Sequence, residues 1–80
     1  MNSSELKIAR IRRGLSSKDM AEKLCLTPAT YSYKENNERK ISLKDAEAIV
    51  KILNLTPEEI LLIFFDININ LNDKKSIELE

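Results

Sequence analysis

The sequence has no histidine and no tryptophan, and its 80 residues include only one cysteine, one glycine and two prolines. Because Cys25 has no second cysteine to pair with, an internal disulfide is excluded, and the lack of histidine removes the commonest general base and metal ligand. The scarcity of glycine and proline argues against a collagen-like or loop-rich chain. The remaining composition, 42% apolar and 32% charged residues, is typical of a compact helical fold.

No segment combines the charged, apolar and small-residue regions of a secretory signal, and no apolar run is long enough to span a bilayer. A second independent core would need roughly 50 residues of its own. We therefore expect one small domain in a reducing, cytoplasmic compartment, and we expect it to need no cofactor.

Thirteen basic and thirteen acidic residues give a net charge of zero, but the two signs are separated along the chain. Residues 1–44 contain ten Lys or Arg and five acids, a net charge of +5, whereas residues 45–80 contain three Lys and eight acids, a net charge of −5. Because charges more than about 10 Å apart are largely screened at ordinary salt, a partner responds to the local field. The N-terminal half is thus a candidate surface for binding a polyanion.

Five helices are predicted, because Ser or Thr residues that can accept a hydrogen bond from a backbone amide precede periodic apolar stretches. They run over about residues 4–13, from Ser16 to about 24, from Thr27 and Pro28 to about 36, from Ser42 through Leu53, and from Thr56 and Pro57 into the apolar run 60–65. Asp19 and Asp45, each three residues after a cap, complete capping boxes. Gly14 and Asn37 follow helices where a left-handed backbone is favoured.

The period of the apolar pattern changes after residue 65. Between 66 and 72, and again between 76 and 80, apolar residues alternate with polar ones, as in a half-buried strand. A lone hairpin is marginal in water, so such strands need a further surface, either helix five or a second copy of the chain. The predicted fold is an all-α, five-helix domain over residues 1–65 with a tail, 66–80, that forms a short β-strand, a hairpin or a dimerisation arm.

Two short helices joined by the three-residue turn 25–27 have the spacing of a helix-turn-helix. The flanking stretches are 14–24 (GLSSKDMAEKL), 26–32 (LTPATYS) and 35–36 (EN). With them the chain resembles the Cro and phage-repressor family of bacterial helix-turn-helix proteins, whose fold is lambda-repressor-like. The resemblance covers roughly residues 6–62.

This resemblance implies a DNA-binding homodimer, usually a transcriptional repressor, that inserts its third helix, about 28–36, into the major groove of each half-site. The residues at the matching base-reading positions are Pro28, Ala29, Thr30 and Tyr33, with Ser32 close by. The family often has Gln, Arg or Asn there, whereas Ala29 and the methyl group of Thr30 mainly contact thymine methyls. We therefore expect a modest preference for A·T, with part of the selectivity from groove shape. Tyr33 is either a base contact or plain surface.

The resemblance also places a set of residues against the DNA phosphates, which supply most of the affinity. They are Ser17, Lys18, Lys34, Asn36, Arg39, Lys40 and Lys44. Ser17 stands where the family usually has Gln, so its contact is shorter, and Lys18 is expected to compensate. Lys34 replaces an apolar or aromatic residue, and we expect its stem to pack while its ammonium reaches a phosphate.

Other positions are predicted to be structural. In this family an Arg on the first helix commonly pairs with a Glu near the end of the third, so the resemblance makes Arg10 and Glu35 a structural ion pair, with a DNA contact by Arg10 as the alternative. Tyr31 replaces an aliphatic core residue, and its hydroxyl is expected at the edge of the core. Cys25, at a turn position where the family often has Gly, is predicted to be a small apolar filler.

The run 60–65 is apolar on every side, which is more than one face of a five-helix core uses. Either the tail of the same chain or a second copy covers the remainder. We favour a two-fold mate joined through helix five and paired strands. The predicted dimer-interface residues are Leu62, Ile63, Phe65, Ile67 and Ile69.

An enzyme is not predicted, because there is no histidine base, phosphate loop or cysteine partner, and the carboxylates fall at capping or surface positions. The alternative to DNA binding is a helix-turn-helix fold kept as a protein-interaction module, such as an adaptor, antirepressor or antitoxin. Zero net charge and the poor base-reading set favour that alternative, whereas the +5 half and the basic residues within 39–44 favour DNA. Neither a membrane nor a small-molecule ligand is predicted.

Overall fold

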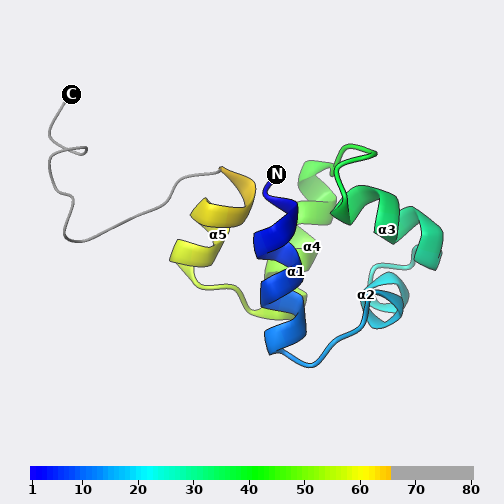
Figure 1. Cartoon of the computed structure of the whole chain (residues 1–80), viewed down its shortest axis with the longest axis horizontal. Coiled ribbons are helices and arrows are strands. Elements are labelled where there is room, and N and C mark those ends of the chain that lie inside the picture. Colours follow the sequence, from blue (N-terminus) through cyan, green and yellow to red (C-terminus); the bar gives the residue numbers. More distant parts are fainter. Residues whose placement is uncertain (66–80) are drawn as a thin grey trace, which may run out of the picture.

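The structure, a computed structural model, describes residues 1–65, and they form five helices and no strand (Figure 1). In chain order they are α1 (Ser3–Arg12), α2 (Ser17–Lys23), α3 (Pro28–Glu35), α4 (Leu43–Leu53) and α5 (Pro57–Phe64). The all-α, five-helix prediction is confirmed. The strand or hairpin predicted within 66–80 lies outside the described residues.

Local hydrogen bonds explain where these helices begin. The side chains of Ser16, Thr27, Ser42 and Thr56 each accept a hydrogen bond from the amide three residues later, and full capping boxes form with Asp19, Asp45 and Glu59. Such caps satisfy amides that have no partner inside the helix. α1 begins one residue earlier than predicted because Asn2 is its cap, with Oδ1 3.2 Å from the amide of Glu5.

Left-handed backbone ends several of these segments. Gly14 (φ 73°) and Asn37 (φ 64°) adopt it, as their positions after helices predict. Cys25 also has positive φ, 59°, and its side chain is exposed. The prediction that Cys25 is an apolar filler was wrong, because the turn between α2 and α3 directs this residue to the surface. An L-residue tolerates this conformation at a cost that glycine avoids.

The apolar core is formed by one or two residues from each helix and by Leu55, which lies between α4 and α5. The buried apolar residues are Leu6, Ala9, Met20, Ala21, Tyr31, Ile49, Leu53, Leu55 and Ile63. α2 packs against α3, and α1 contacts both α3 and α5, so α3 lies at one end of the molecule with a side free of other helices (Figure 1). Within residues 1–65, no helix is both long and apolar enough to cross a membrane.

Candidate nucleic-acid interface

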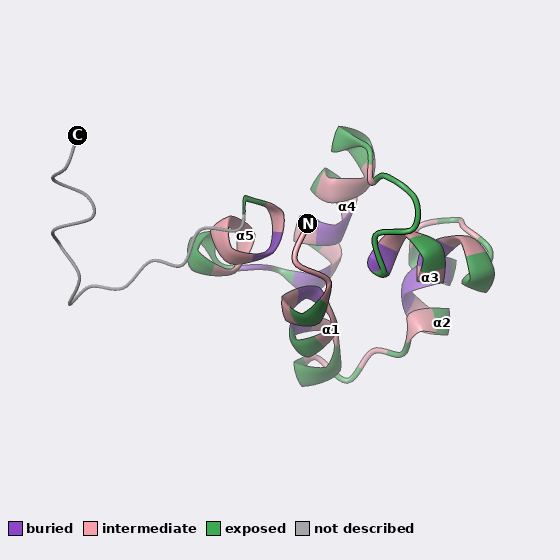
Figure 2. Cartoon of the chain, turned by 45° about the horizontal axis from the view of Figure 1, so that its top comes forward, coloured by how far each residue is buried: buried purple, intermediate pink, exposed green. Residues whose placement is uncertain are grey.

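The outer side of α3 is uncovered by the rest of the described chain. Pro28, Ala29 and Tyr33 are exposed, and Thr30 and Ser32 are half-buried. Tyr31 and Glu35, one turn apart on the opposite side, are buried. Figure 2 shows this combination of buried and exposed residues along α3. The five predicted base-reading residues therefore lie on or beside a free helix face.

An ion pair fixes the rotation of α3 about its axis. Arg10 on α1 donates from Nε to Glu35 Oε2 at 2.8 Å and from Nη2 to Oε1 at 3.4 Å, and its Nη1 donates to the Leu15 carbonyl at 2.8 Å. The Tyr31 hydroxyl donates to Glu35 Oε2 at 2.9 Å. These bonds satisfy the carboxylate of Glu35, a residue that is only 3% exposed. Arg10 and Glu35 thus join α1 to α3 and hold the buried side of α3 inward.

Tyr31 is a core residue whose hydroxyl reaches a buried acid rather than solvent. Burial, followed by the negative charge of Glu35, raises the pKa of the Tyr31 hydroxyl well above its ordinary value of 10.0. The hydroxyl therefore stays protonated near neutral pH and remains a donor to the carboxylate.

The first turn of α3 carries few free hydrogen-bonding groups. Thr27 Oγ1 donates to Thr30 Oγ1 at 2.8 Å and accepts from the Thr30 amide at 3.1 Å. Thr30 presents a methyl group and one hydroxyl proton, and Ala29 presents only a methyl group. This chemistry suits van der Waals contact with apolar groups better than bidentate hydrogen bonding.

A tight reversal after α3 returns the chain toward the helix. The Tyr33 carbonyl accepts from the amides of Glu38, at 2.8 Å, and Arg39, at 3.2 Å. The Asn37 side chain donates from Nδ2 to the Met1 carbonyl at 2.7 Å, which fastens the reversal to the start of the chain. The Arg39 guanidinium carbon then lies 5.2 Å from the centroid of the Tyr33 ring.

Four of the predicted phosphate-binding cations are exposed and form no salt bridge with any residue in 1–65: Lys18, Arg39, Lys40 and Lys44. Lys18 lies in the first turn of α2, Arg39 and Lys40 lie between α3 and α4, and Lys44 lies in the first turn of α4. Ser17, also in the first turn of α2, is half-buried, and Asn36 is exposed with Nδ2 3.3 Å from Ser32 Oγ. In the sequence, these cations therefore lie both before and after α3.

Lys34 has a different environment from the one predicted. Its ammonium lies 2.7 Å from Asp45 Oδ2 and 3.4 Å from the Lys40 carbonyl. The bond to Lys34 is the main reason that the pKa of Asp45 is lowered. This corrects the expectation that the Lys34 ammonium is free to bind a phosphate, because the start of α4 supplies a carboxylate within reach. Lys34 instead ties α3 to the Ser42 capping box.

A second ion pair, which the sequence did not reveal, joins α1 to α5. Arg13 donates from Nη2 to Glu59 Oε1 at 2.7 Å, and its Nε donates to the Leu53 carbonyl. The bond to Arg13 is the main cause of the lowered pKa of Glu59. The only sequence signal was a cluster of arginines in residues 10–13, which does not identify a partner 46 residues away.

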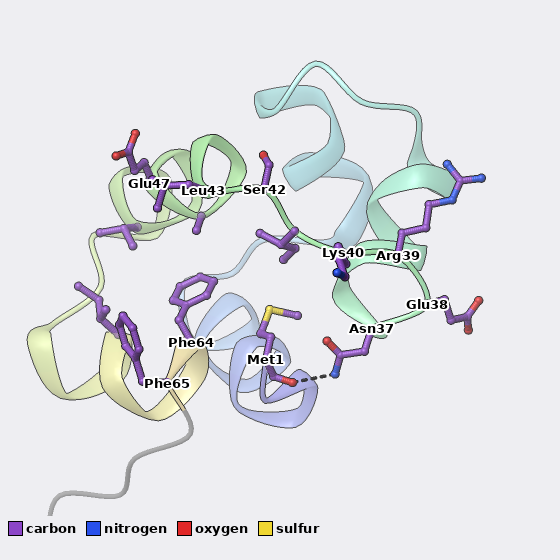
Figure 3. A pocket seen from close by; sticks show the side chains of 14 residues that line it. Met1, Asn37, Glu38, Arg39, Lys40, Ser42, Leu43, Glu47, Phe64 and Phe65 are labelled. Carbon is purple, nitrogen blue, oxygen red and sulfur yellow. Dashed lines mark hydrogen bonds between the residues drawn. The ribbon is translucent and has the colours of Figure 1, made fainter.

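An apolar groove of about 690 Å³ lies among the start of the chain, the segment after α3, α4 and α5 (Figure 3). Met1, the segment 37–42, α4 and α5 line it, with apolar contributions from Leu43, Val50 and Phe64. Phe65 lies at the edge of the groove and is 62% exposed.

Not every predicted dimer-interface residue is available for a partner. Phe65 is exposed and Leu62 is half-buried, but Ile63 is 1% exposed within its own chain. The prediction that Ile63 lies at a dimer interface was therefore wrong, because α5 directs this residue into the core. Ile67 and Ile69 lie outside the described residues.

The described residues contain no group of three or more Cys, Asp or Glu placed to hold a metal ion.

A protein-family model described as helix-turn-helix matches residues 6–60, which is more than half of the chain. The comparison with curated proteins and the comparison with solved structures each gave no match. The matched residues include α2, the turn, α3 and the cation-bearing segment after it.

Proposed function

We propose that this chain, which belongs to the Cro and phage-repressor type of helix-turn-helix family, acts as a homodimeric transcriptional repressor with α3 of each copy in the major groove of one operator half-site. The observation that carries the proposal is the uncovered outer side of α3, with exposed cations in the segments before and after it. A family of DNA-binding regulators and a free recognition helix together favour DNA over other polyanions.

Base recognition in this proposal relies on small contacts. Ala29 and the methyl group of Thr30 contact thymine methyls, with Pro28 and Ser32 beside them at the same base-reading surface. The hydroxyl of Thr30 supplies one hydrogen bond. A duplex rich in A·T is therefore preferred modestly, and its groove shape contributes to selection.

Phosphate recognition relies on charge. Lys18, with the amides at the start of α2, binds the backbone on one side of α3, and Arg39, Lys40 and Lys44 bind it on the other. Ser17 and Asn36 add neutral hydrogen bonds. Each cation that neutralises a phosphate releases counterions, so binding weakens steeply as salt rises.

Dimerisation places the two recognition helices about 34 Å apart, one turn of the duplex, so that both half-sites are read. The exposed Phe65 and the half-buried Leu62 on and beside α5 are the apolar residues that a second copy covers. The apolar groove that Phe65 borders extends this surface to α4.

Titration of a fluorescent random duplex at low and moderate salt tests DNA binding, and selection of bound sites from a random pool tests sequence preference. We expect a steep salt dependence and an enriched, near-palindromic site containing A·T. Absence of binding at low salt would contradict the proposal and favour the protein-interaction hypothesis, in which the apolar groove receives a different protein instead of a second copy of this chain.

A further inference from the structure

Tyr33 and Arg39 form a cation–π pair on the surface beside α3. The guanidinium carbon lies over the ring at 5.2 Å from its centroid, inside the roughly 6 Å at which this attraction acts. Tyr33 is 42% exposed and Arg39 is exposed. The pair therefore lies where a bound duplex can reach it.

The backbone holds the same two residues together independently of the ring. The Tyr33 carbonyl accepts the Arg39 amide at 3.2 Å and the Glu38 amide at 2.8 Å, and the left-handed Asn37 makes the reversal that these bonds require. A substitution of the Tyr33 side chain leaves the carbonyl in place. The ring can thus be removed without removing the turn that brings Arg39 back to α3.

The side chain of Arg39 points toward solvent rather than into the protein. Arg39 is among the residues that line the apolar groove, but in Figure 3 its guanidinium points away from the other lining side chains, and no carboxylate in residues 1–65 forms a salt bridge with it. The ring of Tyr33 is therefore the side-chain partner that the described structure gives to this guanidinium. A long flexible side chain loses rotamer entropy when it binds, and a guanidinium already stacked on a ring loses less.

We infer that Tyr33 is a positioning residue for Arg39, and that its ring holds the guanidinium beside α3 in readiness for a backbone phosphate. The inference rests on the proposed DNA binding. Tyr33 then contributes to the affinity for any duplex and to the salt dependence of that affinity, and it does not contribute to base specificity. This differs from a base-reading role, in which the Tyr33 hydroxyl would donate to a base edge.

The test compares Tyr33→Phe, which keeps the ring and loses the hydroxyl, with Tyr33→Leu, which loses both, in the full chain. Dissociation constants for a selected duplex and for a random duplex are measured by fluorescence anisotropy at several salt concentrations. Tyr33→Phe is expected to bind both duplexes like the unchanged protein. Tyr33→Leu is expected to bind both about two- to fivefold more weakly, the value of an exposed cation–π contact.

Arg39→Gln, alone and combined with Tyr33→Leu, shows whether the ring acts through the arginine. The single change is expected to lower the salt slope by about one. The double variant is expected to bind no more weakly than Arg39→Gln alone, because the ring then has nothing to position. Additive losses, or a Tyr33→Phe variant as weak as Tyr33→Leu, would overturn the inference.

A measurement without DNA keeps this inference separate from the proposed function. Ring currents shift the NMR signals of the Arg39 side chain in the unchanged protein and in Tyr33→Phe, and that shift is expected to disappear in Tyr33→Leu. Circular dichroism of each variant verifies that the helices remain. If the Arg39 guanidinium stacks on the Tyr33 ring but the protein does not bind DNA, both the proposed function and this inference are contradicted. If the protein binds DNA without this stacking, only the inference is contradicted.

Discussion

The guanidinium of Arg10 on α1 holds the carboxylate of Glu35 on α3, with Nε 2.8 Å from Oε2, across 25 positions of sequence. Both side chains are almost entirely removed from solvent. The pair turns the Tyr31 and Glu35 side of α3 inward, which leaves the side with Ala29 and Tyr33 outward. Helix orientation and the candidate DNA interface therefore depend on the same ion pair.

Glu35→Ala is expected to destabilise the domain by roughly 3–5 kcal/mol, because it leaves the Arg10 charge buried without a partner. For a domain of this size that corresponds to a fall in melting temperature of more than about 10 °C. Glu38→Ala is the matched control, since Glu38 is exposed on the following turn and belongs to no salt bridge within residues 1–65. A melting temperature for Glu35→Ala close to that of Glu38→Ala would contradict the structural role.

Neutralising Arg39 or Lys40 with Gln is expected to flatten the plot of log affinity against log salt by about one for each lost phosphate contact. Lys51→Gln serves as the control, because Lys51 is exposed near the end of α4 and is not among the proposed phosphate contacts. The slopes come from anisotropy titrations on a random duplex. An unchanged slope would remove the substituted residue from the interface.

Ala29 is expected to contact a thymine methyl group, and that contact can be tested by changing either the DNA or the protein. Replacing thymine by deoxyuridine in a selected half-site removes the methyl group and should weaken binding about fourfold, the value of one buried apolar carbon. Ala29→Gly should distinguish the two duplexes less than the unchanged protein does, because only the methyl group of Thr30 then remains to contact thymine. If the unchanged protein does not distinguish them, methyl readout by this residue is refuted.

Acid is expected to weaken the fold through Glu59. The bond to Arg13 lowers the pKa of Glu59 below its ordinary value of 4.5, so between the two values the folded chain binds fewer protons than the unfolded chain. The stabilisation is complete above about pH 4.5 and is lost as pH falls through the lowered folded pKa.

Urea unfolding at pH 6 and at pH 3 measures this loss. Glu59→Gln should reduce the difference in unfolding free energy between the two pH values. Glu58→Gln is the matched control, because Glu58 is the neighbouring exposed acid and forms no salt bridge in the described chain. Equal pH dependence in the two variants would show that the Arg13 contact does not persist in solution.

Phe65→Glu is expected to convert the proposed dimer to a monomer, because it puts a charge into an apolar interface. Ile11→Glu is a close control, since Ile11 on α1 is 64% exposed, Phe65 is 62% exposed, and only Phe65 borders the groove. Light scattering after size-exclusion chromatography reports the mass. A monomeric unchanged protein, or dissociation by Ile11→Glu as well, would argue against an interface at α5.

The helix starts were determined by short stretches of sequence. Ser16, Ser42 and Thr56 bond to amides only three residues away, so these caps require no tertiary structure and were predicted correctly. The left-handed residues Gly14 and Asn37 were recognisable for the same local reason. The helix-turn-helix followed from the spacing of these local signals, and the exposure of Tyr33 from the apolar period, whereas the other outward positions of α3 were implied by the family resemblance.

The family resemblance predicted the pairing of Arg10 with Glu35, but only the tertiary structure decided the other long-range partners. Lys34 binds Asp45 because α4 begins within reach of its ammonium, and Arg13 finds Glu59 because α5 packs on α1. Ile63 is buried in the core. The sequence did not indicate this, because all its neighbours in residues 60–65 are apolar and none marks the exposed face of α5. Periodicity cannot orient a helix that is apolar all round, and charge patterns cannot pair side chains until packing has set the distance between their helices.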